Sequence, residues 1–323
     1  SNVPLEAVGR VFAACGRWVQ RNMGSEHIYL RHRAVRLSYR NGQGFTVYLA
    51  DGSTLRTGII ALATGIREAM HPSLEPHRNR VMLSGEMLTM EGQCALLERY
   101  GSLEGKSITI MGGAHSSFSV AHLCLSGVLG RPRHMVVAHR SLIRLFSTGV
   151  SSVLVGPWTH FPAAQTDLCP ETGTAFRYSG LRGAAANTFR EMISGVHANA
   201  SLLHSADRSE ALDSVLSASD LIIQATGYHS RLLPLEIEDR EIWTGDEVEV
   251  VRVLENGLVR LDESQNQIPL YAAGLVPNPT ADNGTQPNSL YSRIGECLLS
   301  ACENPPSFQI FQPLPGVDCH VGV

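Results

Sequence analysis

The stretch that decides the fold is Gly105 to Arg144, GKSITIMGGAHSSFSVAHLCLSGVLGRPRHMVVAHRSLIR. It begins with an apolar, partly β-branched run at Ser107 to Met111, bounded by glycines on both sides, which is typical of a buried parallel strand. A helical pattern follows at Ser116 to Leu129 and stops at Gly130. A second β run occupies His134 to Ala138. The stretch therefore predicts a strand, a turn, a helix and a second strand in that order.

The turn between the first strand and the helix indicates an anion site. A glycine turn at a helix N-terminus directs unpaired backbone N–H groups and the positive end of the helix dipole at a phosphate. The dinucleotide fingerprint is G-x-G-x-x-G/A, whereas this chain has Gly112 and Gly113 followed by Ala114, where the second fingerprint glycine would be. Ser116 and Ser117 add two hydroxyl donors. A tight strand-to-helix connection without a ligand is the other interpretation.

Two arginines follow the second strand of this unit. Arg140 comes directly after the strand, and Arg144 lies four residues further on, one turn later if a helix begins there. Because a 2′-phosphate is held by arginine at this place in dinucleotide-binding folds, the pair favours NADPH over NADH. The plainer alternative is that both arginines lie on the solvated start of a helix.

The composition excludes several classes of function. The 323 residues are 43% hydrophobic with a formal net charge of −4, so there is no basic footprint for nucleic acid or an anionic membrane. No apolar run is long enough to span a membrane and no signal-peptide pattern opens the chain, so a cytoplasmic location is expected. The seven cysteines never form a C-x-x-C pair, which argues against a zinc site.

The flanking sequence predicts helices and a β-meander. Leu5 to Met23 has helical spacing, with residues such as Val11 and Phe12 expected on one buried face. Strands are expected in Ser25 to Leu37, Gly44 to Leu49 and Thr57 to Leu62. Further helices are expected at Glu91 to Tyr100 and Leu181 to Gly195, further strands at Ala200 to Leu203 and Asp220 to Ala225, and a hairpin at Trp243 to Val253 and Gly257 to Leu261.

A short pattern occurs twice in the chain. Ile59 to Gly65 reads IIALATG, and Asp220 to Tyr228 reads DLIIQATGY. Each is a hydrophobic strand that runs into the triplet A-T-G. Two such strands that bracket a strand–turn–helix unit are hard to obtain by chance.

With these residues the chain resembles flavoproteins with two dinucleotide-binding domains, nearest to the flavin-dependent N-hydroxylating monooxygenases. In that family an NADPH domain is inserted within an FAD domain, and an A-T-G strand end marks each crossing. The spelling A-T-G-Y at Ala225 to Tyr228 is close to that group. Leu270 to Leu275 and Asn288 to Gly295 are similar to the last strand of the FAD domain and the helix after it.

The resemblance implies an α/β fold with a Rossmann-like NAD(P)-binding domain at 105–229 inserted into an FAD-domain-like portion at 1–104 and 230–323. It implies that NADPH reduces FAD and that the flavin then oxygenates a small organic substrate. Residues expected to contact FAD or to form the seams are Thr64, Gly65, Thr226, Gly227, Gly274 and Leu275.

One part of the family pattern is missing before Ala63. The strand, G-x-G-x-x-G turn and helix that hold the FAD pyrophosphate in the family do not occur there. The segment would then be truncated, carried by another chain or dispensed with, and a partner chain or second copy would cover the exposed sheet. The alternative function is a scaffold without cofactors that acts as a cyclase, a lyase or a partner subunit.

The sequence between Phe146 and Tyr178 has little periodicity. Long irregular stretches in compact proteins are often functional, so Trp158, His160 and Phe161 are expected to line part of a small-molecule pocket. Other chemistries are less well supported. His115 and His122 have no carboxylate or cysteine nearby to complete a metal site, and the elbow at Ser116 lacks the second glycine of a serine hydrolase.

Overall fold

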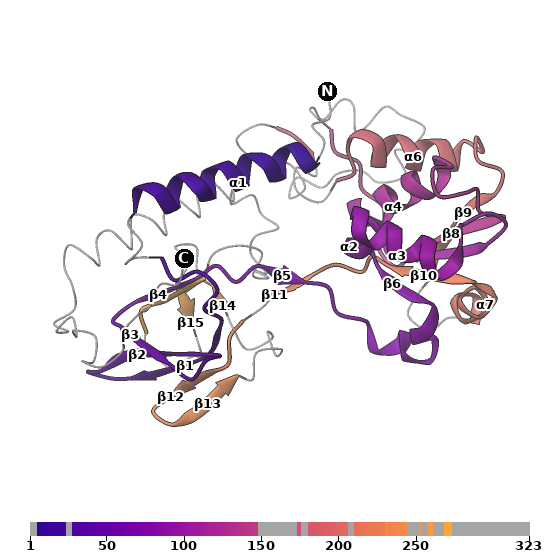
Figure 1. The fold of residues 1–323 in the computed structure, drawn as a ribbon. Coiled ribbons are helices and arrows are strands. Elements are labelled where there is room, and N and C mark those ends of the chain that lie inside the picture. Colours follow the sequence, from indigo (N-terminus) through magenta and orange to yellow (C-terminus); the bar gives the residue numbers. More distant parts are fainter. Residues whose placement is uncertain are drawn as a thin grey trace. The chain divides into compact units, whose positions relative to one another are not determined.

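The structure of this chain is a computed structural model, and its residues form two units. The structure describes residues 5–23, 28–147, 173–175, 180–205, 210–230, 232–243, 252–253, 258–260 and 268–272. The described part of unit 1 lies within 5–65 and 230–272, and that of unit 2 within 66–229. Unit 2 is thus inserted in the sequence of unit 1 (Figure 1).

Unit 1 contains a five-stranded sheet in the order β13-β12-β1-β2-β3. The predicted β-meander is confirmed, because β1, β2 and β3 pair in antiparallel succession. Its third strand lies earlier than expected, since the predicted run Thr57 to Leu62 is not one continuous strand. β12 pairs with β1 in parallel, with Leu235 opposite Leu37. The strands are β1 (Ala34–Arg40), β2 (Gly44–Leu49), β3 (Thr54–Thr57), β12 (Leu235–Ile237) and β13 (Arg240–Trp243).

Two smaller pairs complete the described strands of unit 1. β4 (Ile60–Leu62) and β16 (Leu270–Ala272) run in parallel, with Leu62 opposite Ala272. β14 (Arg252–Val253) and β15 (Val259–Arg260) form an antiparallel pair, which confirms the predicted hairpin. Apolar residues from the five-stranded sheet and from β4 and β16 share one buried cluster, so the sheet and the parallel pair have a common core.

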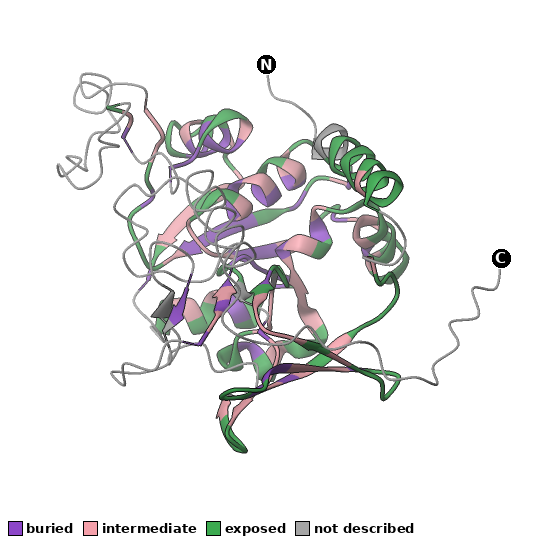
Figure 2. Cartoon of the chain, turned by 90° about the vertical axis from the view of Figure 1, so that its left-hand side faces the viewer, coloured by how far each residue is buried: buried purple, intermediate pink, exposed green. Residues whose placement is uncertain are grey.

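The helix predicted at the start of the chain forms, but its apolar face is not buried. α1 (Leu5–Asn22) ends one residue before the predicted limit. Val11 and Phe12 are 62% and 71% exposed, so the expectation that they lie in a buried face is wrong. Figure 2 colours most of the described part of this helix as exposed. Helical spacing of apolar residues identifies a face that can be covered, whereas burial also requires another element to pack against it.

Unit 2 is built on a five-stranded sheet in the order β6-β10-β7-β8-β9. Every neighbouring pair is parallel, including β7 and β8 with Ile108 opposite Met135, as the sequence predicts. The α/β class with a parallel sheet is confirmed. The strands are β6 (Val81–Leu83), β7 (Ser107–Met111), β8 (His134–His139), β9 (Ala200–His204) and β10 (Leu221–Gln224).

Helices connect and cover these strands. α4 is shorter than predicted, because a turn with Gly127 at φ 79° follows Leu125 and no α-helix can continue through that conformation. α6 and α3 form close to where the sequence predicts them. The helices are η2 (Pro72–Arg80, a 3-10 helix), α2 (Ser84–Met87), α3 (Met90–Tyr100), α4 (His115–Leu125), α6 (Gly183–Ile193) and α7 (Glu210–Ala218).

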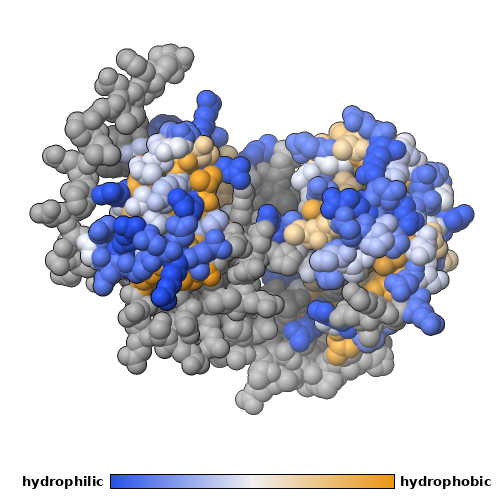
Figure 3. Space-filling model, turned by 90° about the horizontal axis from the view of Figure 1, so that it is seen from below, coloured by the Kyte–Doolittle hydropathy of each residue, from blue (hydrophilic) through white to orange (hydrophobic). Residues whose placement is uncertain are grey.

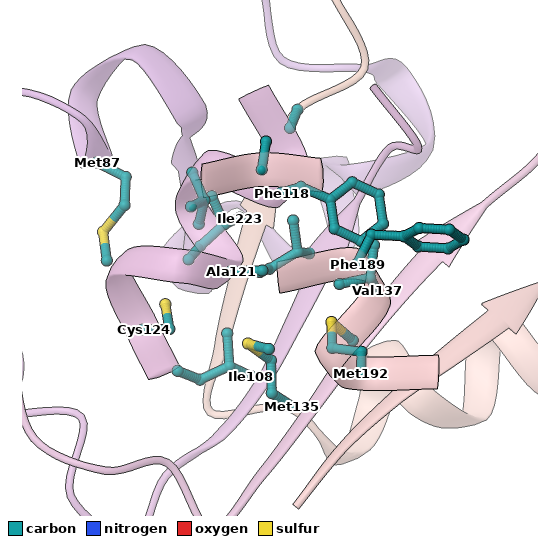
Figure 4. Close-up of a cluster of buried hydrophobic side chains, with 14 of the residues drawn as sticks. Met87, Ile108, Phe118, Ala121, Cys124, Met135, Val137, Phe189, Met192 and Ile223 are labelled. Carbon is teal, nitrogen blue, oxygen red and sulfur yellow. The ribbon is translucent and has the colours of Figure 1, made fainter. Parts of the chain in front are cut away.

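The main core of unit 2 lies between the sheet and the helices α2, α3, α4 and α6 (Figure 4). Phe118 on α4 and Phe189 on α6 meet edge to face, with ring centroids 5.4 Å apart. Ile108 and Ile110 of β7 and Ile223 of β10 contribute to the same cluster. Edge-to-face aromatic pairs add about 0.5–1.5 kcal/mol beyond area burial, so this contact helps to fix α4 against α6.

The opposite face of the sheet packs against α7 and η2. Successive side chains of a strand point to opposite faces of the sheet, so Ile222 of β10 points away from the main core. It packs with Leu216 of α7 and Leu74 of η2 in a separate cluster. Thr109 shares this alternation on β7, and its hydroxyl is hydrogen bonded to that of Ser219 at 2.6 Å in a buried position. Both faces of the sheet are therefore covered, as all-parallel sheets require.

The chain enters and leaves unit 2 through two very short strands. β5 (Ile66–Arg67) follows the first A-T-G triplet and β11 (His229–Ser230) follows the second. The two strands pair with each other. The prediction that the repeated triplets mark related chain crossings agrees with this pairing.

Gln224 links the end of β10 to the segment that enters unit 2. Its side chain is 1% exposed. The amide nitrogen donates hydrogen bonds to the carbonyl oxygen of Ala69 at 2.8 Å and to the hydroxyl of Thr226 at 3.0 Å, and the amide oxygen accepts one from the N–H of His71 at 2.7 Å. One buried amide thus satisfies three polar groups on two segments more than 150 residues apart.

Gly112 packs directly against the end of β10. Its φ is +134°, a conformation that side chains other than glycine rarely adopt. A Cβ at this position would lie 2.2 Å from the carbonyl oxygen of Ala225 and 2.6 Å from the hydroxyl of Ser117. The first glycine of the turn is therefore required by the packing of β7 against β10 as well as by the turn itself.

The described surface is mixed in polarity. On the face shown in Figure 3 hydrophilic side chains predominate, with smaller apolar areas between them. Among the residues that the structure describes, no helix combines the length and the apolar character needed to cross a bilayer.

Gln224→Ala should destabilise the protein strongly. The substitution removes the buried partner of two backbone groups and one hydroxyl in a partly buried place, and a lost hydrogen bond costs about 0.5–1.5 kcal/mol. We expect unit 2 to lose about 2–4 kcal/mol of unfolding free energy in urea denaturation followed by circular dichroism. Gln43→Ala, the same change in an exposed turn of unit 1, should shift the curve by less than about 0.5 kcal/mol.

Gly112→Ala and Gly101→Ala should separate steric overlap from backbone strain. Gly101 also has a positive φ, +74°, but nothing lies within 4 Å of its added Cβ. Gly101→Ala should therefore cost only about 1–3 kcal/mol, the backbone strain of a positive φ in a residue with a Cβ. Gly112→Ala adds a clash with backbone and should cost more than about 3 kcal/mol. Equal melting temperatures for the two variants would contradict this account.

Candidate functional site

The candidate site lies at the carboxyl edge of the sheet in unit 2. β7 and β10 are neighbours, with Met111 opposite Gln224, although helices and two further strands separate them in sequence. After β7 the chain proceeds to β8 and β9 on one side and then returns to β10 on the other. Ligands of open α/β sheets bind outside the carboxyl ends of the strands at such a reversal of strand order.

The N-terminus of α4 points its first N–H groups to this edge. The residue that caps the helix is Ala114, whose side chain has no oxygen and makes no capping hydrogen bond. The N–H groups of the first turn have no partner within a helix. They are therefore available to an anion at the place that the sequence predicts for the dinucleotide pyrophosphate.

The two predicted serines have different surroundings. Ser116 is partly exposed in the first turn of α4. Ser117 is fully buried beneath the turn, and its hydroxyl has no hydrogen-bond partner among the described residues. Ser116 is thus the hydroxyl on the accessible side, whereas Ser117 lies against Gly112.

The second glycine of the turn packs on the loop that follows β8. A Cβ on Gly113 would lie 3.0 Å from the Cβ of His139 and 3.6 Å from the carbonyl oxygen of Ser141. The turn after β7 and the loop after β8 are therefore in direct contact. This contact brings the predicted pyrophosphate seat and the predicted 2′-phosphate loop to one place.

The two predicted arginines are both exposed on this loop. Arg140 directly follows β8, as the sequence predicts. The expectation that a helix carries Arg144 is wrong, because residues 141–147 form no helix. Instead the N–H of Leu181 donates to the carbonyl oxygen of Arg144 at 2.8 Å, and Leu145 bridges to Leu181. Backbone pairing with a distant segment outweighs local helix formation here.

The structure adds basic side chains that the sequence reasoning did not assign to this edge. His115 begins α4, and burial together with the nearby Arg182 lowers its pKa below the usual value. Arg182 is the residue that precedes α6. His139 and His204 end β8 and β9. His139 and His204 could have been identified from the sequence, because each histidine directly follows one of two successive predicted strands.

The predicted seam residues of unit 1 and unit 2 are only partly described. Thr64 and Gly65 are exposed after β4, and Thr226 and Gly227 are exposed after β10. Gly65 and Gly227 have φ of +74° and +109°, so glycine suits both positions. Gly274 and Leu275, and the predicted pocket residues Trp158, His160 and Phe161, lie outside the described residues.

The described residues of unit 1 do not by themselves provide a complete seat for FAD. Parallel pairing places the carboxyl ends of β4 and β16 at the same edge. However, no strand in the described part of unit 1 is followed by a glycine turn and a helix. In the residues that the structure describes, no group of three or more metal-ligating side chains occurs either.

The chain is similar to proteins of known activity. No family model matches it. It is 30% identical over 244 residues to the CMP-5′-(3-aminopropyl)phosphonate hydroxylase of Streptomyces rubellomurinus, a match that covers 72% of this chain and 51% of that protein. The chain thus spans about half the length of this curated relative.

Two solved structures have a similar fold. The cadaverine monooxygenase DfoA of Erwinia amylovora, bound to FAD, matches with a TM-score of 0.52 and 18% identity over 93% of this chain and 76% of its own. L-lysine 6-monooxygenase of Pseudomonas syringae matches with a TM-score of 0.53 and 14% identity over 93% of this chain and 80% of its own. The fold of this chain is that of the flavin-dependent N-hydroxylating monooxygenases.

Proposed function

We propose that this chain is the NADPH-binding part of a flavin-dependent monooxygenase that oxygenates a small organic substrate. The observation that carries the proposal is the glycine turn at Gly112. This turn joins β7 to the uncapped start of α4, and it packs against the end of the neighbouring strand β10. This combination of strand reversal, close backbone approach and free helix N–H groups is what a dinucleotide pyrophosphate requires.

The charge of the loop after β8 supports a phosphorylated nucleotide. Arg140 and Arg144 are exposed there, and among the described residues no carboxylate follows β8 directly, where NAD-binding folds place an acid for the ribose hydroxyl. A guanidinium suits a phosphate because it donates two parallel hydrogen bonds. NADPH is therefore the proposed cofactor, and it would supply a hydride.

The proposed assignment of the parts follows the order of the sequence. The NAD(P)-binding domain would correspond to 105–229, and the flanking segments 1–104 and 230–323 to a portion of the FAD domain. Thr64 and Gly65 after β4, together with Gly274 and Leu275, would face the flavin. Thr226 and Gly227 would form the second seam.

The proposed substrate is a small molecule that carries an amine. The names of the three similar proteins refer to an aminopropylphosphonate nucleotide, to cadaverine and to lysine, and each of these compounds contains a primary amine. An amine nitrogen is a nucleophile that can accept an oxygen atom. Trp158, His160 and Phe161 remain the proposed pocket residues.

The second candidate is a protein that uses the same scaffold without redox cofactors. Two observations favour it: Ala114 replaces a fingerprint glycine, and no strand–turn–helix unit occurs in the described part of unit 1. Ligand binding distinguishes the candidates, because a ligand that binds the folded state raises the melting temperature. A thermal shift with NADP⁺ is expected, and the absence of any shift would favour the second candidate.

Arg140→Ala should weaken the binding of NADP⁺ far more than that of NAD⁺. Loss of a hydrogen bond to a charged group costs about 1.5–3 kcal/mol, which corresponds to an increase in Kd of roughly 10- to 150-fold. Isothermal titration calorimetry measures the Kd of each nucleotide for the variant and for the original chain.

Arg133→Ala is the matched control, since Arg133 stands before β8 at the amino edge and hydrogen bonds Ser107. It should leave both affinities within about twofold of the original chain. If Arg133→Ala weakened NADP⁺ as much as Arg140→Ala, the assignment of the 2′-phosphate to the loop after β8 would be wrong.

A further inference from the structure

A pair of histidines lies at the carboxyl edge of the sheet in unit 2. His139 and His204 are the last residues of β8 and β9 and are opposite each other in register. Their ring centroids are 5.2 Å apart, and the ring planes are inclined by 50°. Because β8 and β9 are parallel and fixed in the sheet, the two imidazoles are held together at the loop that carries Arg140.

Backbone contacts determine which ring nitrogens carry hydrogen. The Nδ1 of His139 lies 2.9 Å from the carbonyl oxygen of Ser141, and the Nε2 of His204 lies 2.9 Å from that of Arg140. A carbonyl oxygen only accepts, so both nitrogens must donate. In the described part of the chain, Nε2 of His139 and Nδ1 of His204 have no hydrogen-bond partner.

The surroundings of His139 disfavour its charged form. Burial lowers the pKa of His139, the hydrogen bond to Ser141 opposes that shift, and the neighbouring His204 lowers the pKa further. Gly113 also packs against the Cβ of His139, the N–H of Ser205 donates to its carbonyl oxygen, and the cationic Arg140 is the next residue in the chain. No described neighbour is a carboxylate, so a bound phosphate would supply the missing negative charge.

We propose that the His139–His204 pair takes up a proton when the 2′-phosphate of NADPH binds beside Arg140, so that pH controls the preference for the phosphorylated nucleotide. The inference rests on the proposed function, because it concerns the same loop. A neutral pair offers a phosphate only the N–H groups already used by the backbone. A protonated pair offers a further donor and a positive charge.

The sign of the pH dependence follows from linkage. A complex that binds a proton more tightly than the free protein gains affinity as the pH falls toward the pKa of the free pair. Protonation of the phosphate itself, with a second pKa of about 6, acts in the opposite direction. The gain should therefore be observed above about pH 6.5, where the phosphate remains a dianion.

Calorimetric titration of the protein with NADP⁺ and with NAD⁺ at pH 6.5 and pH 8.0 tests the inference. NADP⁺ should bind about fivefold more tightly at the lower pH, because one bound proton changes an affinity by at most tenfold per pH unit. NAD⁺ lacks the 2′-phosphate, so its affinity should change by less than about twofold over the same range.

The double variant His139→Asn with His204→Gln removes the titration and keeps the backbone contacts. The Asn amide nitrogen stands close to the position of Nδ1, and the Gln amide nitrogen close to that of Nε2, so both donors are retained. At pH 8.0 the variant should bind NADP⁺ with the same affinity as the original chain. At pH 6.5 it should not show the tighter binding of NADP⁺ that the original chain shows. His134→Asn, at the opposite end of β8, is the matched control and should keep the full pH dependence.

A measurement on the unmodified chain makes the test independent of variant folding. Titration of NADP⁺ in two buffers with different ionisation enthalpies gives the number of protons bound with the nucleotide. Near pH 7 we expect a measurable uptake of less than one proton per NADP⁺ bound. We expect no proton uptake when NAD⁺ binds. NADP⁺ binding without proton uptake, or a double variant with an unchanged pH dependence, overturns the inference and leaves the proposed function standing. Failure of both nucleotides to bind at any pH overturns the proposed function itself.

Discussion

The parallel pairing of β7 with β10 is the constraint on which the rest of unit 2 depends. It joins strands separated by three helical crossovers, which contain α4, α6 and α7, and sets Met111 opposite Gln224. The close approach of the two strand ends leaves room at position 112 for glycine alone, because the carbonyl oxygen of Ala225 occupies the place of a Cβ. The turn that starts α4 is thus fixed by the sheet, and its direction gives the helix N-terminus its position.

The same pairing connects stability with the site. Gln224 at the end of β10 holds the entering segment at Ala69 and His71 through partly buried hydrogen bonds, while Ser117 under the turn is buried and has no hydrogen-bond partner among the described residues. Buried polar groups normally find partners, and the exceptions often mark functional places. In unit 2 a fully satisfied amide and an unsatisfied hydroxyl lie on either side of the strand ends where a nucleotide is proposed to bind.

Local patterns were sufficient for most of unit 2 and insufficient for three features. The strands around Ile108 and Met135 and the helix α4 could be predicted, because apolar runs, glycine boundaries and helical spacing are local. The coil at Arg144 could not be predicted, since its backbone pairs with Leu181. The meeting of His139 with His204 depends on strand order, and the exposure of Phe12 depends on what packs against α1.

The sequence by itself determined the α/β class and the strand–glycine–helix turn, because each is written in residues close together in the chain. Only the tertiary structure decided which side of the turn is accessible, with Ser116 partly exposed and Ser117 buried, and which side chains share the carboxyl edge of the sheet. Strand order and register bring distant residues together through backbone hydrogen bonds that any residue except proline can donate. For that reason they leave little trace in a single sequence.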